Sequence, residues 1–181
     1  KKVKQIDKLI VSTDSQEIAE IAISGGATVP YLRPKELAED STPEWLVWQN
    51  ILTYLHLENQ FPKALVVLLP TAPLRNLDDV TGAIELFFNN NCDGVLCATD
   101  ANRNPFFNMI SVDNNGLCKT AMEGKKIFRR QDAKKFFDVT TVCYVVDPKF
   151  VLEHSHLLDG KILMHYVPPE RSIDIDNQLD F

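Results

Sequence analysis

Short β-type segments alternate with amphipathic helical segments along most of this chain, and this alternation restricts the fold more than any other feature. Apolar residues recur at helical spacing between Ser15 and Gly25, whereas Ala64–Leu69 is a continuous apolar run, typical of a strand buried on both faces. The expected elements, in chain order, are a strand at Leu9–Thr13, a helix capped by Asp14 or Ser15, a helix at Pro43–Leu57, the Ala64–Leu69 strand, a helix from Asn76 or Asp78 to Phe88, strands at Gly94–Ala98 and Val139–Val146, a short helix near Pro148, and a strand at Lys161–Val167.

This order predicts a three-layer α/β/α, Rossmann-like fold with a mainly parallel central sheet. A length of 181 residues suits one domain over residues 1–181. Residues 102–137 depart from the pattern, because they are polar and irregular, with a hairpin signal at Asp113–Gly116. We therefore expect this segment to be an excursion inserted into the α/β domain.

Composition excludes several function classes. The net charge of −6 disfavours a nucleic-acid surface, and no apolar run approaches the length of a membrane span. The four cysteines lie in or beside apolar runs without a C-x-x-C pair, so buried, reduced thiols in a cytoplasmic protein are expected. An acidic protein can still bind a phosphorylated small molecule if a few arginines gather locally.

The segment around Asp174 and Asp176 carries the clearest chemical signal. Residues i and i+2 of an extended segment point to the same side, so the two carboxylates would project together and repel each other unless a cation lies between them. Mg²⁺ suits such a pair, since it takes one or two carboxylates and completes its coordination with water and phosphate oxygens. A solvated strand end or a pair of helix caps is the alternative.

A rigid loop at Pro70–Arg75 follows a predicted strand, at the edge where open α/β sheets bind ligands. Arg75 could reach a phosphate from this loop. The alternative is a stiff connector whose arginine pairs with Asp78 or Asp79.

Five separated motifs together resemble the acylneuraminate cytidylyltransferases, also called CMP-sialic acid synthetases. They are Val11–Ala19, Leu32–Ala38, Leu68–Arg75, Arg129–Asp132 and Ser172–Asp176. The resemblance implies a nucleotidyltransferase of the nucleotide-diphospho-sugar transferase fold. Its implied reaction joins CTP and a nine-carbon 2-keto acid sugar to give the CMP-sugar and pyrophosphate, as used in building lipopolysaccharide, capsule or other glycans.

The resemblance also implies the roles of individual residues. Asp174 and Asp176 would hold Mg²⁺ (or Mn²⁺), and Arg33 and Arg75 would contact the nucleotide. The remaining implied positions face the sugar acid; they are Arg130, which would also act in catalysis, Gln131, Tyr144, Leu69 and Thr140. A guanidinium fork at Arg130 would suit the sugar carboxylate. For Tyr144, an ordinary core tyrosine is an equal alternative.

Departures from the family pattern concern the acceptor and the nucleotide loop. Leu69 and Ala72 replace a glutamine and a serine, and Thr140–Val142 replaces Asn-Gly-Ala, which suggests a legionaminic or pseudaminic acid relative as acceptor. The family's basic, glycine-rich triphosphate loop has no counterpart here. We therefore expect an N-terminally truncated fragment, inactive alone, of an active full-length enzyme.

Two rival functions are a different sugar-nucleotide enzyme, either a 3-deoxy-octulosonate cytidylyltransferase or an Asp-x-Asp glycosyltransferase, and a non-catalytic degenerate relative. The resemblance further implies a homodimer whose excursion closes the partner's sugar site. Phe106 and Phe107 would then lie in an interface, unless they are buried within the chain.

Overall fold

The computed structural model of this protein describes residues 3–124 and 127–181, and only the backbone of Arg130. Its centre is a four-stranded sheet in the order β1-β5-β2-β6, formed by Leu65–Val67 (β1), Phe137–Val146 (β5), Gly94–Asp100 (β2) and Ile162–Tyr166 (β6). A separate two-stranded hairpin pairs Ile110–Val112 (β3) with Cys118–Thr120 (β4).

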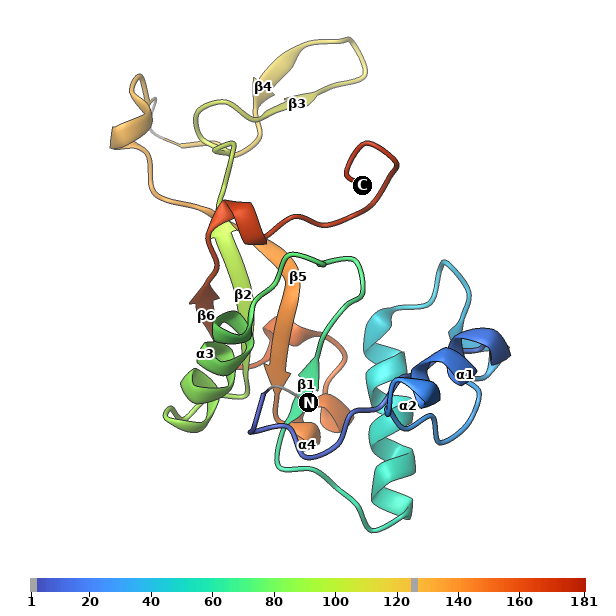
Figure 1. The fold of residues 1–181 in the computed structure, drawn as a ribbon. Coiled ribbons are helices and arrows are strands. Elements are labelled where there is room, and N and C mark those ends of the chain that lie inside the picture. The colour runs from blue at the N-terminus through green and yellow to red at the C-terminus, as the bar shows by residue number, and fades with distance from the viewer. Residues whose placement is uncertain (1–2, 125–126) are drawn as a thin grey trace.

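The sheet is mixed. β2 and β6 pair in parallel, whereas β5 pairs antiparallel with both β1 and β2. Strands β1, β2 and β6 therefore run in one direction, as predicted, and only β5 opposes them. The reason is the excursion: the chain leaves at the carboxyl end of β2 and re-enters the sheet at that same edge (Figure 1). A strand that starts where its neighbour ends must run back alongside it.

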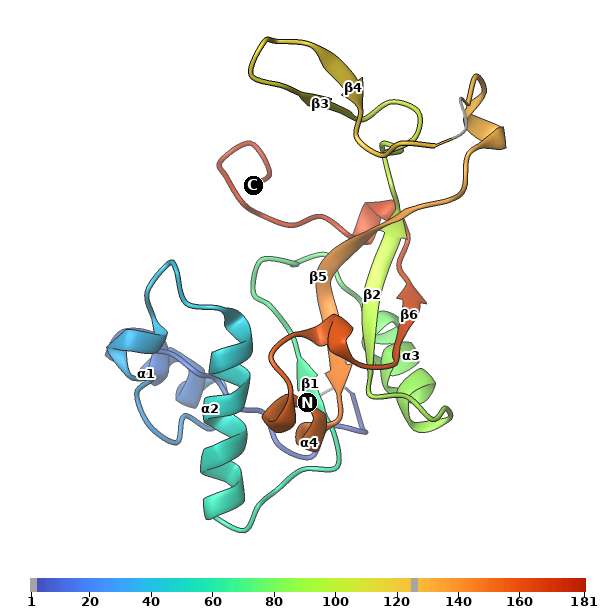
Figure 2. The ribbon, with the colours of Figure 1, turned by 180° about the vertical axis from the view of Figure 1, so that it is seen from behind.

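Helices cover both faces of the sheet, which confirms the α/β fold class (Figures 1 and 2). On one face, α3 (Leu77–Phe88) packs on β2 and β5 through an apolar cluster that includes Ile84, Val95 and Val145. On the other, α2 (Glu44–Leu57) and α4 (Pro148–Glu153) pack together around Val146. The remaining helix, α1 (Gln16–Ser24), lies beside α2, and single 3-10 turns occur at Lys35–Leu37, Arg130–Asp132, Leu157–Asp159 and Pro169–Arg171.

Local sequence explains where the helices start. Ser15 accepts a hydrogen bond from the backbone of Ile18 at the start of α1, and Asn76 forms a capping box with Asp79 at the start of α3. Both caps were among the predicted alternatives. Asp147 caps α4, whose first residue is Pro148, a position where a missing N–H costs nothing.

Three details of the sequence-based prediction are wrong. Leu9–Thr13 forms no strand, only an isolated parallel bridge between Ile10 and Thr28. β1 is half-buried rather than buried on both faces, because β5 is its one neighbour among the described residues. Cys118 is exposed on β4, although Cys97 and Cys143 are buried as expected.

Between β2 and β5 the chain projects away from the sheet and forms the β3–β4 hairpin at its tip (Figure 1). Gly116 takes the positive φ of 80° that the hairpin turn needs, and Asp113 accepts hydrogen bonds from the Asn115 and Leu117 backbones. No helix in the described part of the chain combines the length and the apolar character needed to cross a membrane.

Candidate active site at the carboxyl edge of the sheet

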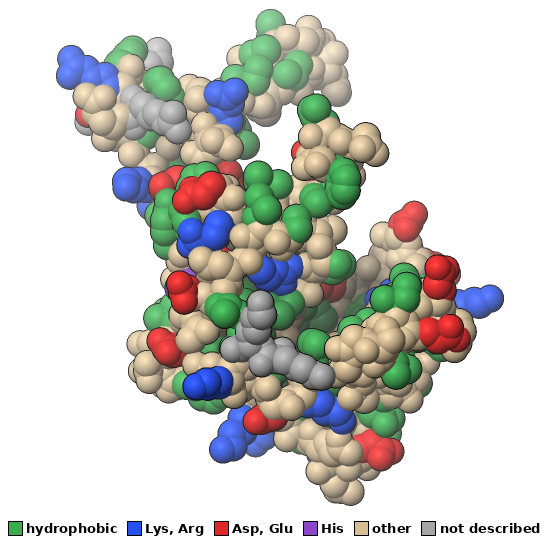
Figure 3. All heavy atoms as spheres, in the orientation of Figure 1, with side chains coloured by type: hydrophobic (Ala, Val, Ile, Leu, Met, Phe, Trp, Pro, Cys, Tyr) green, Lys and Arg blue, Asp and Glu red, His purple; other side chains and the backbone are tan. Residues whose placement is uncertain are grey.

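Two connecting segments meet at the carboxyl edge of the sheet. The loop after β1 and the C-terminal tail after β6 are joined by a hydrogen bond from the Ile175 backbone N–H to the Thr71 carbonyl oxygen, 2.9 Å long. The tail crosses above the sheet, and the surface is indented between it and the α1–α2 unit (Figures 1 and 3). Ligands of open α/β sheets bind at this edge.

Asp174 lies in the extended tail segment and is half-buried. Its Oδ1 atom is buried and has no hydrogen-bond partner within the structure. Asp176 is exposed, and its backbone N–H donates to the Asp180 carboxylate. A buried carboxylate oxygen without a partner is costly, so Asp174 is suited to a ligand that supplies positive charge.

The donor set fits a hard divalent cation. Among the described residues, no group of three or more histidine, cysteine, aspartate or glutamate side chains could hold a metal. Mg²⁺ or Mn²⁺ needs only one or two protein carboxylates. Asp174 and Asp176 could therefore hold such an ion together with water and phosphate oxygens.

Tyr144 on β5 borders the same region. Its ring packs against Trp48 of α2 with 5.6 Å between ring centroids. Burial, assisted by the nearby carboxylates of Glu44 and Asp174, raises the pKa of Tyr144 to about 12. The phenol is consequently protonated at neutral pH and can donate a hydrogen bond.

Arg33 provides a cation on the α1–α2 side. Its backbone N–H donates to the Thr13 carbonyl oxygen at 2.8 Å, which connects it to the turn before α1. The guanidinium Nη2 lies 3.8 Å from an Asp14 carboxylate oxygen, while the buried Nε has no partner. The side chain is therefore partly held and keeps a donor available for a ligand.

Arg75 is turned back under its own loop, where its Nε donates to the Ala72 carbonyl oxygen at 2.8 Å. Burial lowers the pKa of Arg75, and the thiols of Cys143 and Cys97 lie near its charge. The suggested pairing with Asp79 is not made, because Arg171 holds that carboxylate.

The other predicted positions are distributed unevenly. Leu69 is half-buried just after β1, and Thr140 is buried on β5 with an unpartnered Oγ1. Gln131 is exposed in the 3-10 turn of the excursion, which lies far from the C-terminal tail (Figures 1 and 2). The role predicted for Arg130 depends on a side chain outside the described part of the structure.

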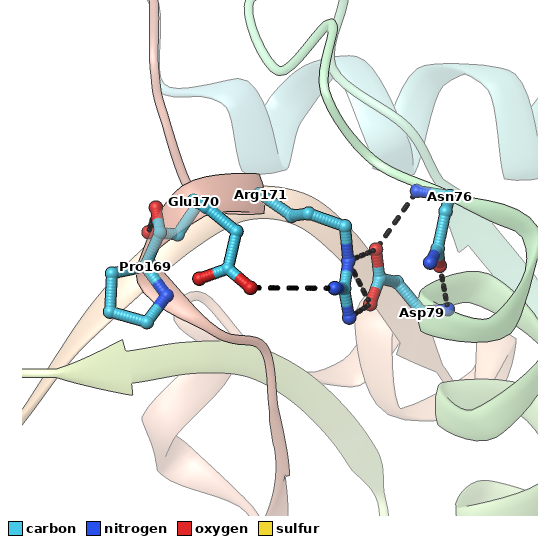
Figure 4. A network of polar contacts seen from close by, with 6 residues as sticks. Asn76, Asp79, Pro169, Glu170 and Arg171 are labelled. Atoms are coloured by element: carbon cyan, nitrogen blue, oxygen red, sulfur yellow. Dashed lines mark hydrogen bonds and ion pairs between the residues drawn. The ribbon is translucent and has the colours of Figure 1, made fainter.

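The prediction missed an ion pair beside the site. Arg171 donates from Nε at 3.2 and 3.0 Å and from Nη2 at 2.9 Å to the Asp79 carboxylate (Figure 4). Burial alone would raise the pKa of Asp79, but hydrogen bonds from Arg171 and the Asn76 backbone hold it below its usual value. The Asn-x-x-Asp spacing could have indicated a capping role for Asp79, but nothing local indicates Arg171 as its partner.

Similar proteins are found by sequence, although no family model matches the chain. It is 33% identical over 181 residues to a CMP-N,N'-diacetyllegionaminic acid synthase of Campylobacter jejuni, covering 98% of this chain and 75% of that protein. Flagellin modification protein B of Campylobacter coli is 30% identical, with 100% of this chain and 77% of that protein covered. A pseudaminic acid cytidylyltransferase of Campylobacter jejuni is 28% identical, with 96% and 75% covered.

Solved structures agree on the fold. A 4-diphosphocytidyl-2C-methyl-D-erythritol synthase from Anaerococcus prevotii superimposes with a TM-score of 0.63 at 15% identity, over 98% of this chain and 80% of that one. A CMP:2-keto-3-deoxy-manno-octonic acid synthetase with CTP gives 0.62 at 9% identity, over 92% and 75%. At these identities the likeness establishes the nucleotidyltransferase fold and nothing more specific.

Proposed function

The chain belongs to the acylneuraminate cytidylyltransferase family and is a nucleotidyltransferase; from this premise we propose that it transfers CMP from CTP to a nine-carbon 2-keto acid sugar. The anomeric hydroxyl oxygen bonds to the α-phosphorus, the bond from that phosphorus to the bridging oxygen breaks, and pyrophosphate leaves. The hydroxyl proton passes to solvent.

The observation that best supports this proposal is the buried Oδ1 atom of Asp174, which has no hydrogen-bond partner. It lies at the carboxyl edge of the sheet, where open α/β sheets bind their ligands. We assign Asp174 and Asp176 as the residues that hold Mg²⁺ or Mn²⁺. When bound, the ion would offset negative charge on the phosphates. The chain's own contribution is to hold the two carboxylates at the sheet edge.

Other residues are assigned to binding the substrates. Arg33 keeps a free Nε donor in a half-buried setting, which suits the nucleotide. The protonated hydroxyl of Tyr144 suits an acceptor hydroxyl or carboxylate. The roles of Arg75 toward CTP, and of Arg130, Gln131 and Thr140 toward the sugar acid, are part of the same proposal.

For the acceptor we favour a legionaminic or pseudaminic acid. The apolar Leu69 and Ala72 favour a differently decorated sugar from sialic acid, and the relatives that are 33% and 28% identical to the chain are named for those two acids. An octulosonate acceptor is the alternative; the likeness to an octulosonate-activating enzyme is one of fold and does not separate the two.

Assembly and location complete the proposal. The projecting excursion exposes Ile110, Val112 and Phe128, which supports a homodimer closed by this segment. Phe106 packs on Phe136 within the chain, so it is at least partly buried without a partner subunit. Cysteines free in the structure, Cys118 among them exposed, support a reducing cytoplasm.

The test is pyrophosphate release by the protein. CTP and Mg²⁺ are supplied with sialic, legionaminic, pseudaminic or 3-deoxy-octulosonic acid. We expect release with one nine-carbon acid. Release with the octulosonic acid alone would identify the alternative acceptor, and no release with any acid would contradict the proposal.

A further inference from the structure

The C-terminal tail that carries both aspartates has little structure of its own. After the 3-10 turn at Pro169–Arg171, residues 172–181 form no helix or strand, and most of them are exposed. An exposed segment without helix or strand keeps a fixed position only where contacts tie it to the domain. Its position relative to the sheet must therefore come from specific tethers.

Two tethers bracket Asp174. Arg171, three residues before Asp174, binds the Asp79 carboxylate. Ile175, the residue after Asp174, donates its backbone N–H to the Thr71 carbonyl oxygen. The first tether uses a side-chain fork and the second a backbone bond. Together they hold the intervening residues against the loop that follows β1.

The Arg171 fork has a rigid base. Asp79 is only 2% exposed, lies in the first turn of α3, and accepts a further hydrogen bond from the Asn76 backbone N–H. Both of its oxygens accept from Arg171 (Figure 4). A guanidinium bound to both oxygens of a fixed carboxylate has its direction fixed as well as its distance.

The placement of this pair points to more than stability. A buried ion pair contributes little net stability compared with apolar packing. This pair nevertheless joins the first turn of α3 to Arg171, the last residue of the 3-10 turn that leads into the segment with Asp174 and Asp176. By contrast, Glu170 lies 3.9 Å from the same guanidinium but is 72% exposed, so it cannot direct the arginine.

We propose that Asp79 and Arg171 are positioning residues, which hold Asp174 and Asp176 in the orientation that binds the divalent cation. This inference rests on the proposed function, since it assigns residues that support the same site. It adds two side chains that contact neither the cation nor the nucleotide.

The test compares Arg171→Lys and Asp79→Asn with the unchanged full-length protein. Lysine keeps the charge but loses the fork, and asparagine keeps an acceptor for the Asn76 N–H but loses the charge. Direct titration with Mn²⁺, followed by paramagnetic resonance, should show affinity reduced by about tenfold in each, the usual effect of removing a ligand's support. In the pyrophosphate assay, kcat should fall by about tenfold, with KM for CTP changed less than about threefold.

Two controls separate positioning from lost stability. Glu170→Gln removes the exposed neighbour of Arg171 and should leave Mn²⁺ affinity unchanged. Ile84→Val trims the buried core of α3 and should lower the melting temperature without changing Mn²⁺ affinity.

The outcomes are distinguishable. The inference is overturned if the unchanged protein binds no Mn²⁺, if both variants bind it within about twofold of the unchanged protein, or if Ile84→Val weakens binding as much as they do. If Mn²⁺ binding falls as expected but no acceptor yields pyrophosphate, the positioning role stands and the proposed function fails.

Discussion

The body of the domain and the carboxyl edge of its sheet differ in how they treat polar atoms. In the body, Val95 and Val145 are fully buried, and helix starts are capped by side chains such as Asn76 and Asp147. At the edge, a carboxylate oxygen, Asp174 Oδ1, is buried without a partner, whereas the unpartnered atoms buried in the body, Trp48 Nε1 and Thr140 Oγ1 among them, are uncharged.

This difference separates stability from ligand binding. The body gains most of its stability from apolar burial, whereas an unpartnered buried carboxylate oxygen lowers stability until a ligand satisfies it. Substitutions in the body should therefore change unfolding, and substitutions at the edge should change binding and turnover. Four changes test that division.

The largest effect on unfolding is expected for Leu52→Ala in α2. Leu52 is 0% exposed, and its truncation leaves a cavity that should lower the free energy of unfolding by about 2–5 kcal/mol. Urea denaturation measures the loss. Turnover per folded molecule should stay unchanged; a fall in turnover at full folding would show that body and edge are not separable.

Asp176→Asn should have the opposite effect to Leu52→Ala: activity should fall while stability stays unchanged. The side chain is exposed, so the free energy of unfolding should stay within about 0.5 kcal/mol of the unchanged protein. Loss of a cation ligand should nevertheless lower pyrophosphate release by about 100-fold or more. The exposed Asp40→Asn serves as the matched control. Near-normal activity in Asp176→Asn would remove the metal assignment.

An intermediate effect is expected from the pH dependence of the Asp79 pair, which lies on the border between body and edge. The folded pKa of Asp79 is held below its unfolded value of about 3.9, so the stability that it contributes is fully present above that pH. It is lost as the pH falls through the lower folded pKa. Acid unfolding of Asp79→Asn should be shallower below about pH 4 than that of the unchanged protein. Parallel acid curves would contradict the pairing.

The smallest effect on stability is expected from Ile110→Ser combined with Val112→Ser on the β3–β4 hairpin. Both residues are more than half exposed, so unfolding of the dilute protein should change by less than about 0.5 kcal/mol. If the excursion is an interface, sedimentation of the full-length double variant should shift from dimer toward monomer. A monomeric unchanged protein would dismiss the dimer altogether.

Short-range patterns in the chain were sufficient for most elements. Helical spacing and capping residues identified α1, α2 and α3, and the Asp113–Gly116 turn identified the hairpin. The strand expected at Leu9–Thr13 failed because β propensity alone supplies no neighbouring strand, and a strand needs one to form a ladder. The aspartate pair could also be recognised from local sequence, because the argument for it needs only the two-residue spacing between Asp174 and Asp176.

The chain's own chemistry was thus enough to identify the α/β class, the helix caps and the carboxylates. Only the tertiary structure decided that β5 is antiparallel to its neighbours, that Asp174 Oδ1 is buried without a partner, and that Arg171 forms an ion pair with Asp79. Asp79 and Arg171 are 92 positions apart in the sequence, and no local pattern links them. Such partnerships depend on where the loops and tail meet in space, which is set by the packing of the whole sheet and its helices.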